Sequence, residues 1–364
     1  MRELHSLKPE ILATFNFVQS PVMLAGMNGL PEPPLSYAEI LLRFGYLNEE
    51  LLHGLIAAWR SILKLLNANV IVASHAPTAM LAARTLDIPV ITVGSGFCVP
   101  PRVNPVPNMR PWMPVPTERL AEADRIVTKS INTILEHYAR PPLGFLAELF
   151  DVQANLLCTF PEFDHYQPRI PELQRGMYVG PIIETRQGEP LAWPDGIGKK
   201  VLVYLRPETR DWEAIMHALA DTGCRVIAAI PGISESQKNR MESQRCRVYG
   251  HGVHLASLLP ECDLAINYAG HGYISAVMAA GVPMLCVTMH LEQFLLAQRV
   301  SQMGAGVCIN PDAPPPDYRQ LIPSVLANAA LKENAQQFSE KYRQFDQAAQ
   351  MQSITNLIES TAKA

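Results

Sequence analysis

The chain has 364 residues, 31 prolines and a formal net charge of −4. This length suffices for two domains that each bury a core. No run of like charge supports binding to nucleic acid or an anionic membrane, and no apolar run reaches the roughly 18 to 20 residues that a membrane span needs. The seven cysteines form no zinc-ligand cluster, so we expect a cytoplasmic protein with reduced thiols and no bound metal.

In the first half of the chain, short β-rich runs alternate with helical patterns. The predicted elements are a strand at 11–18, helices at 37–44 and 48–66, a strand at 70–73, a helix at 78–86 and a strand at 90–93. Strands separated by helices of this length favour parallel βαβ units. A proline-rich loop at 98–116 then follows a strand end, where open α/β sheets bind ligands. Apolar side chains in and just before this loop suggest an apolar acceptor, and packing within the loop explains them equally well: Phe97, Val99, Met109, Trp112 and Met113.

A second series of strands and helices follows a segment rich in Pro, Gly and charge. Its predicted elements are strands at 201–205, 225–230, 264–267 and 282–288, a helix at 211–222, and one or two closing helices over 331–364. The fold class is therefore α/β, with two Rossmann-like domains facing across a cleft. The predicted parts are an acceptor-side domain at 1–183, a linker at 184–198, a ligand-binding domain at 199–340 and a C-terminal helix at 341–364 that packs back on the first domain.

The most informative stretch is the loop that follows the buried strand at 264–267. Gly270 and Gly272 permit a tight turn, and a helix can begin at Tyr273. A helix that begins there directs free N–H groups at whatever lies above the loop. The stretch therefore predicts an anion-binding site.

With these residues in view, the second half resembles the donor domain of nucleotide-sugar-dependent glycosyltransferases of the B fold, especially bacterial relatives of UDP-glycosyltransferases and macrolide glycosyltransferases. The family signature combines a Gly-rich loop, an Ala-rich helix, Gly-Val-Pro and an acidic residue followed by Gln. This chain matches it with Gly270, Gly272, Gly281-Val282-Pro283 and Glu292-Gln293. Tyr178-Val179-Gly180-Pro181 also resembles the segment that closes the family's first domain.

The resemblance implies an inverting transfer of a sugar from a nucleoside diphosphate to a hydroxyl of a small, apolar acceptor, without a metal or cofactor. It implies three groups of donor-binding residues: Tyr268, Gly270, His271, Gly272, Tyr273 and Arg206 at the diphosphate, His290, Glu292 and Gln293 at the sugar, and Val253 and His254 near the base. Structural roles compete for several of them. His271 can simply fill the loop, His290 can shape a turn, and Arg206 can pair with Glu208 or Asp211.

Several positions depart from the family pattern. Tyr268 and Tyr273 replace a His and a Thr, and Ser74 stands where the family has an Asp that orients the catalytic His. The family's opening strand, with the turn that bears this His, is expected to be missing ahead of residue 11. A start upstream of Met1, a degenerate protein and a substitute base at His75 each account for this. We therefore keep a second hypothesis, a noncatalytic relative that binds nucleotide sugars or lipids.

Overall fold

The computed structural model describes residues 9–24, 26–166 and 176–364. These residues divide into two compact units. The first unit holds the described residues of 9–156, 176–177 and 352–364, and the second holds those of 157–166 and 178–351. The whole of the proposed linker, 184–198, lies within the second unit, and the predicted domain boundaries stay predictions.

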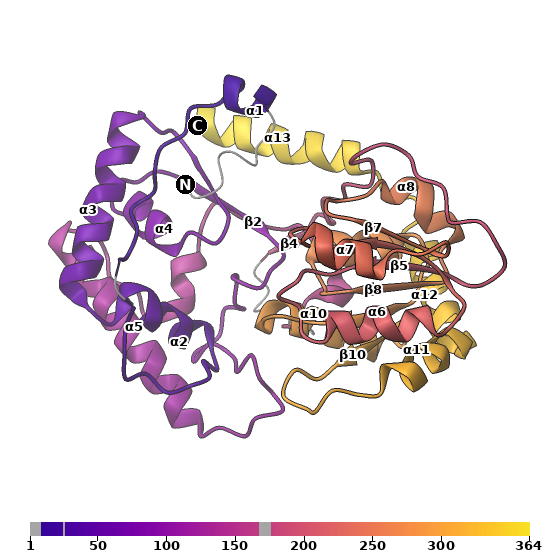
Figure 1. The fold of residues 1–364 in the computed structure, drawn as a ribbon. Coiled ribbons are helices and arrows are strands. Elements are labelled where there is room, and N and C mark those ends of the chain that lie inside the picture. Colours follow the sequence, from indigo (N-terminus) through magenta and orange to yellow (C-terminus); the bar gives the residue numbers. More distant parts are fainter. Residues whose placement is uncertain (1–8, 25, 167–175) are drawn as a thin grey trace. The chain divides into compact units, whose positions relative to one another are not determined.

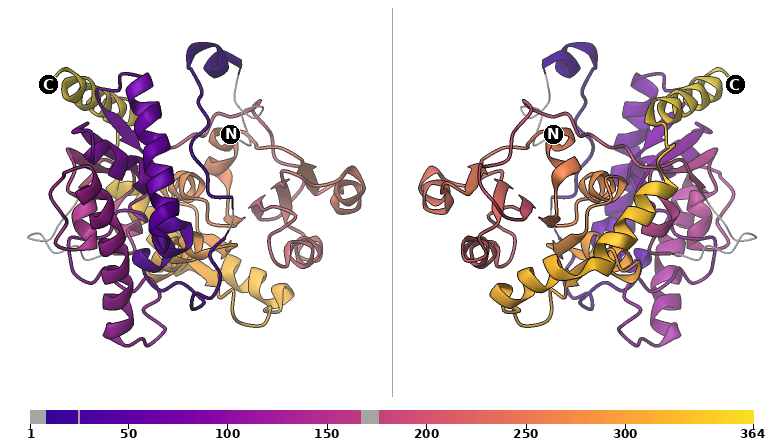
Figure 2. Two further views of the ribbon diagram at one scale, coloured as in Figure 1. Left: turned by 90° about the vertical axis from the view of Figure 1, so that its left-hand side faces the viewer. Right: turned by 90° about the vertical axis from the view of Figure 1, so that its right-hand side faces the viewer.

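The first unit is built on a four-stranded sheet with the strand order β1-β2-β3-β4, whose last two strands end at the border with the second unit. β1 and β2 are parallel, with Ile71 opposite Val90. Its helices and strands are α1 (Pro9–Thr14), α2 (Tyr37–Leu41), a π-helical turn η2 (Leu42–Tyr46), α3 (Glu49–Leu65), β1 (Ile71–Ala73), α4 (Pro77–Arg84), β2 (Val90–Gly94), α5 (Thr117–His137), η3 (Leu146–Phe150), β3 (Ala154–Leu157) and β4 (Met177–Tyr178). The long helices α3 and α5 pack side by side (Figure 2).

The strand predicted at 11–18 is wrong, because Pro9–Thr14 forms the short helix α1 and no strand follows it among the described residues before 37. No side chain of α1 is buried, and Phe15 is 62% exposed. A strand needs a neighbour for its backbone hydrogen bonds, whereas a helical turn satisfies part of its backbone locally. Pro9 and Glu10 also favour a helix start.

The proline-rich loop 98–116 is fastened to the body of the first unit. The N–H of Met109 donates to the carbonyl of Leu35 at 2.7 Å, and the N–H of Val106 donates to Asp124 of α5 at 2.9 Å. Met109 is 1% exposed, so it packs inside the unit and does not offer a surface to a ligand. Trp112 is 38% exposed, so part of its side chain lies at the surface and can contact a ligand.

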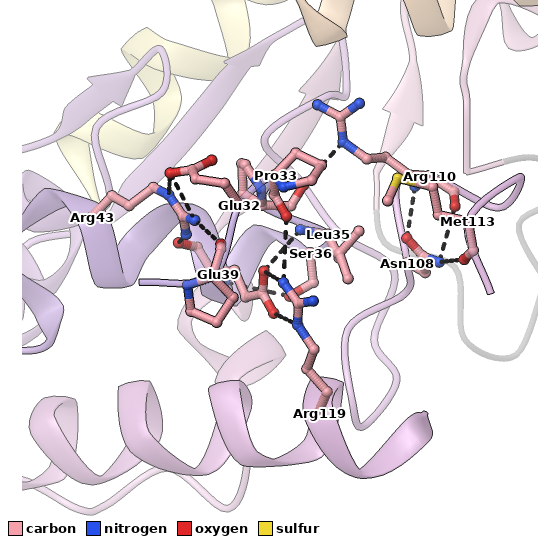
Figure 3. Close-up of polar contacts among 12 residues, drawn as sticks. Glu32, Pro33, Leu35, Ser36, Glu39, Arg43, Asn108, Arg110, Met113 and Arg119 are labelled. Carbon is pink, nitrogen blue, oxygen red and sulfur yellow. Dashed lines mark hydrogen bonds and ion pairs between the residues drawn. The ribbon is translucent and has the colours of Figure 1, made fainter. Parts of the chain in front are cut away.

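Three arginines hold the neighbouring segment 31–36 (Figure 3). Arg43, Arg110 and Arg119 donate to the carbonyls of Pro31, Pro34 and Pro33. Arg119 also donates two hydrogen bonds, of 2.7 and 2.9 Å, to the buried carboxylate of Glu39. The N–H of Leu35 donates to the same carboxylate at 3.0 Å. Glu39 thus joins α2, the 31–36 segment and α5.

Glu39→Gln is expected to lower the free energy of unfolding by about 2 kcal/mol, because it removes the charge that compensates Arg119. The loss stays below the value for a fully buried pair because the Arg119 side chain is 32% exposed and can reach water. Urea unfolding followed by circular dichroism measures the change. Glu122→Gln in the exposed Glu122–Arg125 pair is the matched control and should cause no measurable loss. Equal stabilities for both variants would contradict the role of Glu39.

The second unit is a six-stranded parallel sheet with the order β10-β9-β8-β5-β6-β7, covered by helices on both faces (Figure 1). Its elements are η4 (Pro161–Phe163), β5 (Lys200–Tyr204), α6 (Trp212–Ala220), β6 (Arg225–Ala229), α7 (Glu235–Met241), β7 (Cys246–Tyr249), α8 (Leu255–Leu258), η6 (Leu259–Glu261), β8 (Leu264–Asn267), α9 (His271–Ala279), β9 (Met284–Val287), α10 (Leu291–Gln302), β10 (Gly306–Ile309), α11 (Tyr318–Ala327), α12 (Ala329–Lys341) and α13 (Gln347–Lys363), the last of which ends in the first unit.

Successive residues of each central strand enter two different cores. On β5, Leu202 packs in one core, while Val201 and Val203 pack in the other. A strand buried on both faces reads as a continuous apolar run, and this pattern predicted the strand at 282–288. The α/β fold class predicted from the sequence is confirmed.

Candidate functional site

The strand order of the second unit reverses at one point. From β5 the chain continues to β6 and β7 on one side, and then returns to place β8 on the other side of β5. Open α/β sheets bind ligands at such a switch point, outside the carboxyl ends of the strands. Tyr204 of β5 lies opposite Asn267 of β8, so the loops after these two residues flank the switch point.

The loop after β8 turns sharply into α9. The Asn267 side chain is fully buried, and its Oδ1 accepts the N–H of Ala269 at 2.8 Å. Ala269 takes the left-handed conformation, with φ +63°, and Gly270 caps α9 without a side-chain hydrogen bond. The first N–H groups of α9 therefore have no capping side chain. This geometry supports the anion site that the sequence predicts.

Three tyrosines and one arginine gather beside this turn. The Tyr204 ring lies 5.2 Å from Tyr268 and 4.9 Å from Tyr273, measured between ring centroids. Arg206, exposed just beyond β5, lies 5.9 Å from the centre of the Tyr268 ring. A hydrogen bond to Tyr268 raises the pKa of Arg206, and burial together with a hydrogen bond to Tyr268 raises the pKa of Tyr204 to about 12. Arg206 therefore brings positive charge to the switch point.

A pocket of about 210 Å³ is bordered by Tyr204, Tyr273 and the segment before α8. It is lined by Ile182, Glu184, Gln187, Leu202, Val203, Tyr204, Gly252, Val253, Leu255, Gly272 and Tyr273. It thus joins Val253, predicted near the base of a nucleotide, to Gly272 and Tyr273, predicted at the diphosphate. His254 does not line the pocket, and its Nδ1 instead accepts the N–H of Ser257 at 3.2 Å to cap α8.

His271 has partners within its own unit. Its Nε2 lies 2.8 Å from the hydroxyl of Thr159, and Phe163 packs edge-on against its ring at 6.3 Å. Burial lowers the pKa of His271, while the nearby Glu292 opposes the shift. The imidazole is therefore mostly neutral at pH 7, and these contacts favour a structural role over a direct charge on the ligand.

The residues predicted at the sugar lie at the start of α10. Gln293 is 8% exposed, and its Oε1 accepts the N–H of Met289 at 2.8 Å. His290 precedes the helix with an exposed side chain that makes no capping hydrogen bond. Glu292 is half-buried near His271. All three lie at the carboxyl end of β9, two strands from β5.

His75 follows β1 in the first unit. Its side chain is exposed, its φ is +47°, and its ring lies 6.1 Å from Tyr37. Left-handed backbone in a residue other than glycine costs free energy and is concentrated at functional sites. α4 begins at Pro77 without a side-chain cap, so neither Ser74 nor Thr78 caps it. His75 therefore stays a candidate.

Sequence reasoning missed Tyr204, Glu184, Gln187 and Thr159. Tyr204 lies near the carboxyl end of a predicted strand, where open α/β sheets bind ligands. This position could have identified it as a candidate site residue. No sequence signal connects Thr159 with His271, which is 112 residues away. Within the described residues, no three His, Cys, Asp or Glu side chains gather as a metal site would require. None of the described helices has both the length and the apolar character needed to cross a bilayer.

Comparison with known proteins identifies related sequences. Residues 213–350 match the family described as Erythromycin biosynthesis protein CIII-like, C-terminal domain. An L-demethylnoviosyl transferase of Streptomyces niveus is 29% identical over 101 residues, which cover 28% of this chain and 26% of that protein. A PGL/p-HBAD biosynthesis glycosyltransferase of Mycobacterium tuberculosis (strain ATCC 25177 / H37Ra) is 23% identical over 333 residues, which cover 84% of this chain and 74% of the relative.

Solved structures share the fold. The glycotransferase of kitacinnamycin superposes with a TM-score of 0.64 at 19% identity, over 90% of this chain and 84% of that one. The glycosyltransferase VinC, solved in complex with DTDP, gives 0.57 at 17% identity, over 90% of this chain and 79% of that one. These matches make the chain similar to macrolide-type glycosyltransferases, and it shares the B fold of the solved glycosyltransferases.

Proposed function

We propose that this chain is a glycosyltransferase that moves a sugar from a nucleoside diphosphate to a hydroxyl of a small, apolar acceptor. The observation that carries the proposal is the switch point of the second unit. There an uncapped helix N-terminus, the Arg206 guanidinium and an aromatic pocket adjoin one another. An anion beside an aromatic pocket is the combination that a nucleoside diphosphate presents. The DTDP in the VinC structure supports this choice of ligand.

In the proposed reaction the acceptor oxygen attacks the anomeric carbon from the side opposite the diphosphate. The new carbon–oxygen bond forms as the bond to the diphosphate oxygen breaks, so the configuration inverts. The acceptor proton passes to a base, for which His75 is the candidate, and the nucleoside diphosphate leaves with the bonding electrons. The N–H groups at the start of α9 and the Arg206 charge stabilise the negative charge that grows on the leaving group.

The remaining roles follow from position. Gly270 and Gly272 let the backbone of the turn approach the diphosphate, and the Tyr268 hydroxyl can donate to it. Glu292 and Gln293 offer a carboxylate and an amide to sugar hydroxyls, beside His290. Because Gln293 already uses its Oε1 on the Met289 N–H, its NH₂ group is the one assigned to the sugar.

Isothermal titration with UDP and dTDP tests the donor site directly. We expect saturable binding of at least one of them below about 1 mM. No binding at that concentration would contradict the proposal. A second assay incubates the protein with UDP-glucose or dTDP-glucose and a panel of phenols, and detects the glycoside by mass spectrometry. Binding without transfer to any acceptor would favour the noncatalytic alternative.

A further inference from the structure

A second cavity lies in the first unit, at the edge of the sheet where its strands begin. Its lining includes Val90, the first residue of β2, and Gln153, which directly precedes β3. The N–H of Gln153 donates to the carbonyl of Val90 at 3.0 Å, so the starts of these two strands adjoin each other. Open α/β sheets bind their ligands at the opposite edge, where parallel strands end. His75 follows the end of β1 at that opposite edge, so this cavity is a separate place in the same unit.

The cavity has the size and the walls of a small-molecule site. Its volume of about 570 Å³ falls within the roughly 300 to 1,000 Å³ of pockets that hold small ligands. Met80 and Leu149, which are 3% and 1% exposed, line it together with the half-buried residues Ile88 and Val152. The cavity therefore offers an apolar group of a ligand a place in which it is shielded from water.

Four charged side chains also line the cavity, and three of them already have ionic partners. Arg140 pairs with Asp87 at 2.5 Å, so these two charges compensate each other. Asp151 pairs with Arg102, which does not line the cavity, at 3.2 Å. The fourth charge belongs to Arg84, which has no carboxylate partner among the described residues.

The Arg84 guanidinium has donors to spare. Arg84 is half-buried in the last turn of α4, where the negative end of the helix dipole favours a cation. Within the described part of the chain its side chain makes one hydrogen bond, from Nη1 to the carbonyl of Glu148 at 3.2 Å. A guanidinium has five N–H donors, so most of them lack a protein partner. Shielding an unpaired charge from water costs free energy, and an anion in the cavity would supply the missing partner.

We propose that this cavity binds an organic monocarboxylate with an apolar body. The carboxylate pairs with Arg84, because a planar guanidinium matches a carboxylate with two parallel hydrogen bonds. The apolar body packs against the side chains of Met80 and Leu149. Asp87 and Asp151 repel a ligand with a second negative charge, which disfavours a phosphate dianion. The site lies apart from the reaction proposed above and does not depend on it.

Isothermal titration with four probes separates the charge of the ligand from its apolar body. 1-Naphthoate has both, acetate has the charge alone, 1-naphthalenemethanol has the body alone, and inorganic phosphate has more charge and no apolar body. We expect the wild-type protein to bind 1-naphthoate at least about tenfold more tightly than each of the other probes. The reason is that only 1-naphthoate uses both the Arg84 guanidinium and the apolar wall.

Two variants test where 1-naphthoate binds. Arg84→Gln removes the charge and should weaken binding by about 10- to 100-fold, the range for hydrogen bonds to a charged group. Arg84→Lys should recover part of the loss. Val152→Trp fills the cavity from a half-buried position and should also weaken binding by at least about tenfold, so it tests the site even if Arg84→Gln does not fold. Arg125→Gln, in the exposed Glu122–Arg125 pair of α5, is the matched control and should keep the wild-type affinity.

Several results would overturn this inference. One is the absence of detectable 1-naphthoate binding to the wild-type protein at about 5 mM. Equal affinity for 1-naphthalenemethanol would leave Arg84 without a role, and tighter binding of phosphate would contradict the assignment to a monocarboxylate. Unchanged 1-naphthoate affinity in both Arg84→Gln and Val152→Trp would place the ligand elsewhere, such as at the acceptor site. UDP affinity should be the same in every variant, so the proposed function stands or falls separately.

Discussion

Replacing Arg206 by alanine is expected to weaken the binding of UDP and dTDP by about 10- to 100-fold. Arg206 follows β5 at the switch point, and Tyr268 holds its guanidinium beside the turn into α9. Hydrogen bonds to a charged group contribute about 1.5 to 3 kcal/mol, which corresponds to this range of affinity. Arg206→Lys should recover part of the loss, because it keeps the charge without the planar fork. Isothermal titration of the three proteins with UDP measures the effect.

Arg210 is the matched control for Arg206. It lies four residues further on but donates to the carbonyls of Pro311 and Ala313 at 2.8 and 2.7 Å, and it pairs with Asp211 at 3.1 Å. Arg210→Ala should therefore lower the melting temperature with little change in UDP affinity. Arg206→Ala should do the reverse. Unchanged UDP affinity in Arg206→Ala would show that the α9 N-terminus holds the diphosphate without this side chain.

The elements that the sequence predicts well are those whose patterns depend on local surroundings alone. The strands at 201–205, 225–230, 264–267 and 282–288 are confirmed to within two residues at each end. All four are apolar runs buried on both faces. Burial of this kind produces a continuous apolar run in the sequence, whichever strand lies beside it. The strand at 11–18 failed because its apolar residues had no neighbour to pair with, which no local pattern can reveal.

The candidate site shows the same division. The turn after β8 was predictable as a local feature, although its left-handed residue is Ala269 and Gly270 has an ordinary φ of −65°. The tyrosine cluster was not, because Tyr204 and Tyr268 meet only through the pairing of β5 with β8. The same limit applies to His271, whose partner Thr159 lies in a distant part of the chain. Strand order and long-range packing, absent from any local pattern, decide these contacts.

Replacing Asp124 by asparagine is expected to stabilise the first unit at pH 8 and to have little effect near pH 4. Asp124 is 2% exposed on α5, and burial raises its pKa to about 6. Its Oδ2 accepts the N–H of Val106, while Oδ1 has no hydrogen-bond partner among the described residues. At pH 8 the folded protein must therefore bury a charged carboxylate with one oxygen unsatisfied.

The sign of the pH dependence follows from the raised pKa. Below the unfolded value of about 3.9, the carboxyl is protonated in both states and causes no penalty. As the pH rises toward 6, only the unfolded state loses its proton, so the free energy of unfolding falls. Above pH 6 the penalty is complete, at up to about 3 kcal/mol from two pKa units. The asparagine side chain of the variant cannot ionise, and its oxygen still accepts the N–H of Val106. Its NH₂ group replaces the carboxylate oxygen that lacks a hydrogen-bond partner and lacks one in turn. The expected gain in the free energy of unfolding at pH 8 is therefore about 1 to 2 kcal/mol.

Urea unfolding of the wild-type protein and Asp124→Asn at pH 4, 6 and 8 measures this dependence. Asp151→Asn is the control, because Asp151 is partly exposed and pairs with Arg102 at 3.2 Å. Its loss should not stabilise the protein at any of these pH values. An Asp124→Asn protein that is no more stable than wild type at pH 8 would mean that Asp124 is solvated in the folded state. The gain we expect instead implies that the protein keeps a charged group beneath the loop 98–116 at a cost in stability. Such a cost is typical of residues retained for a role other than stability.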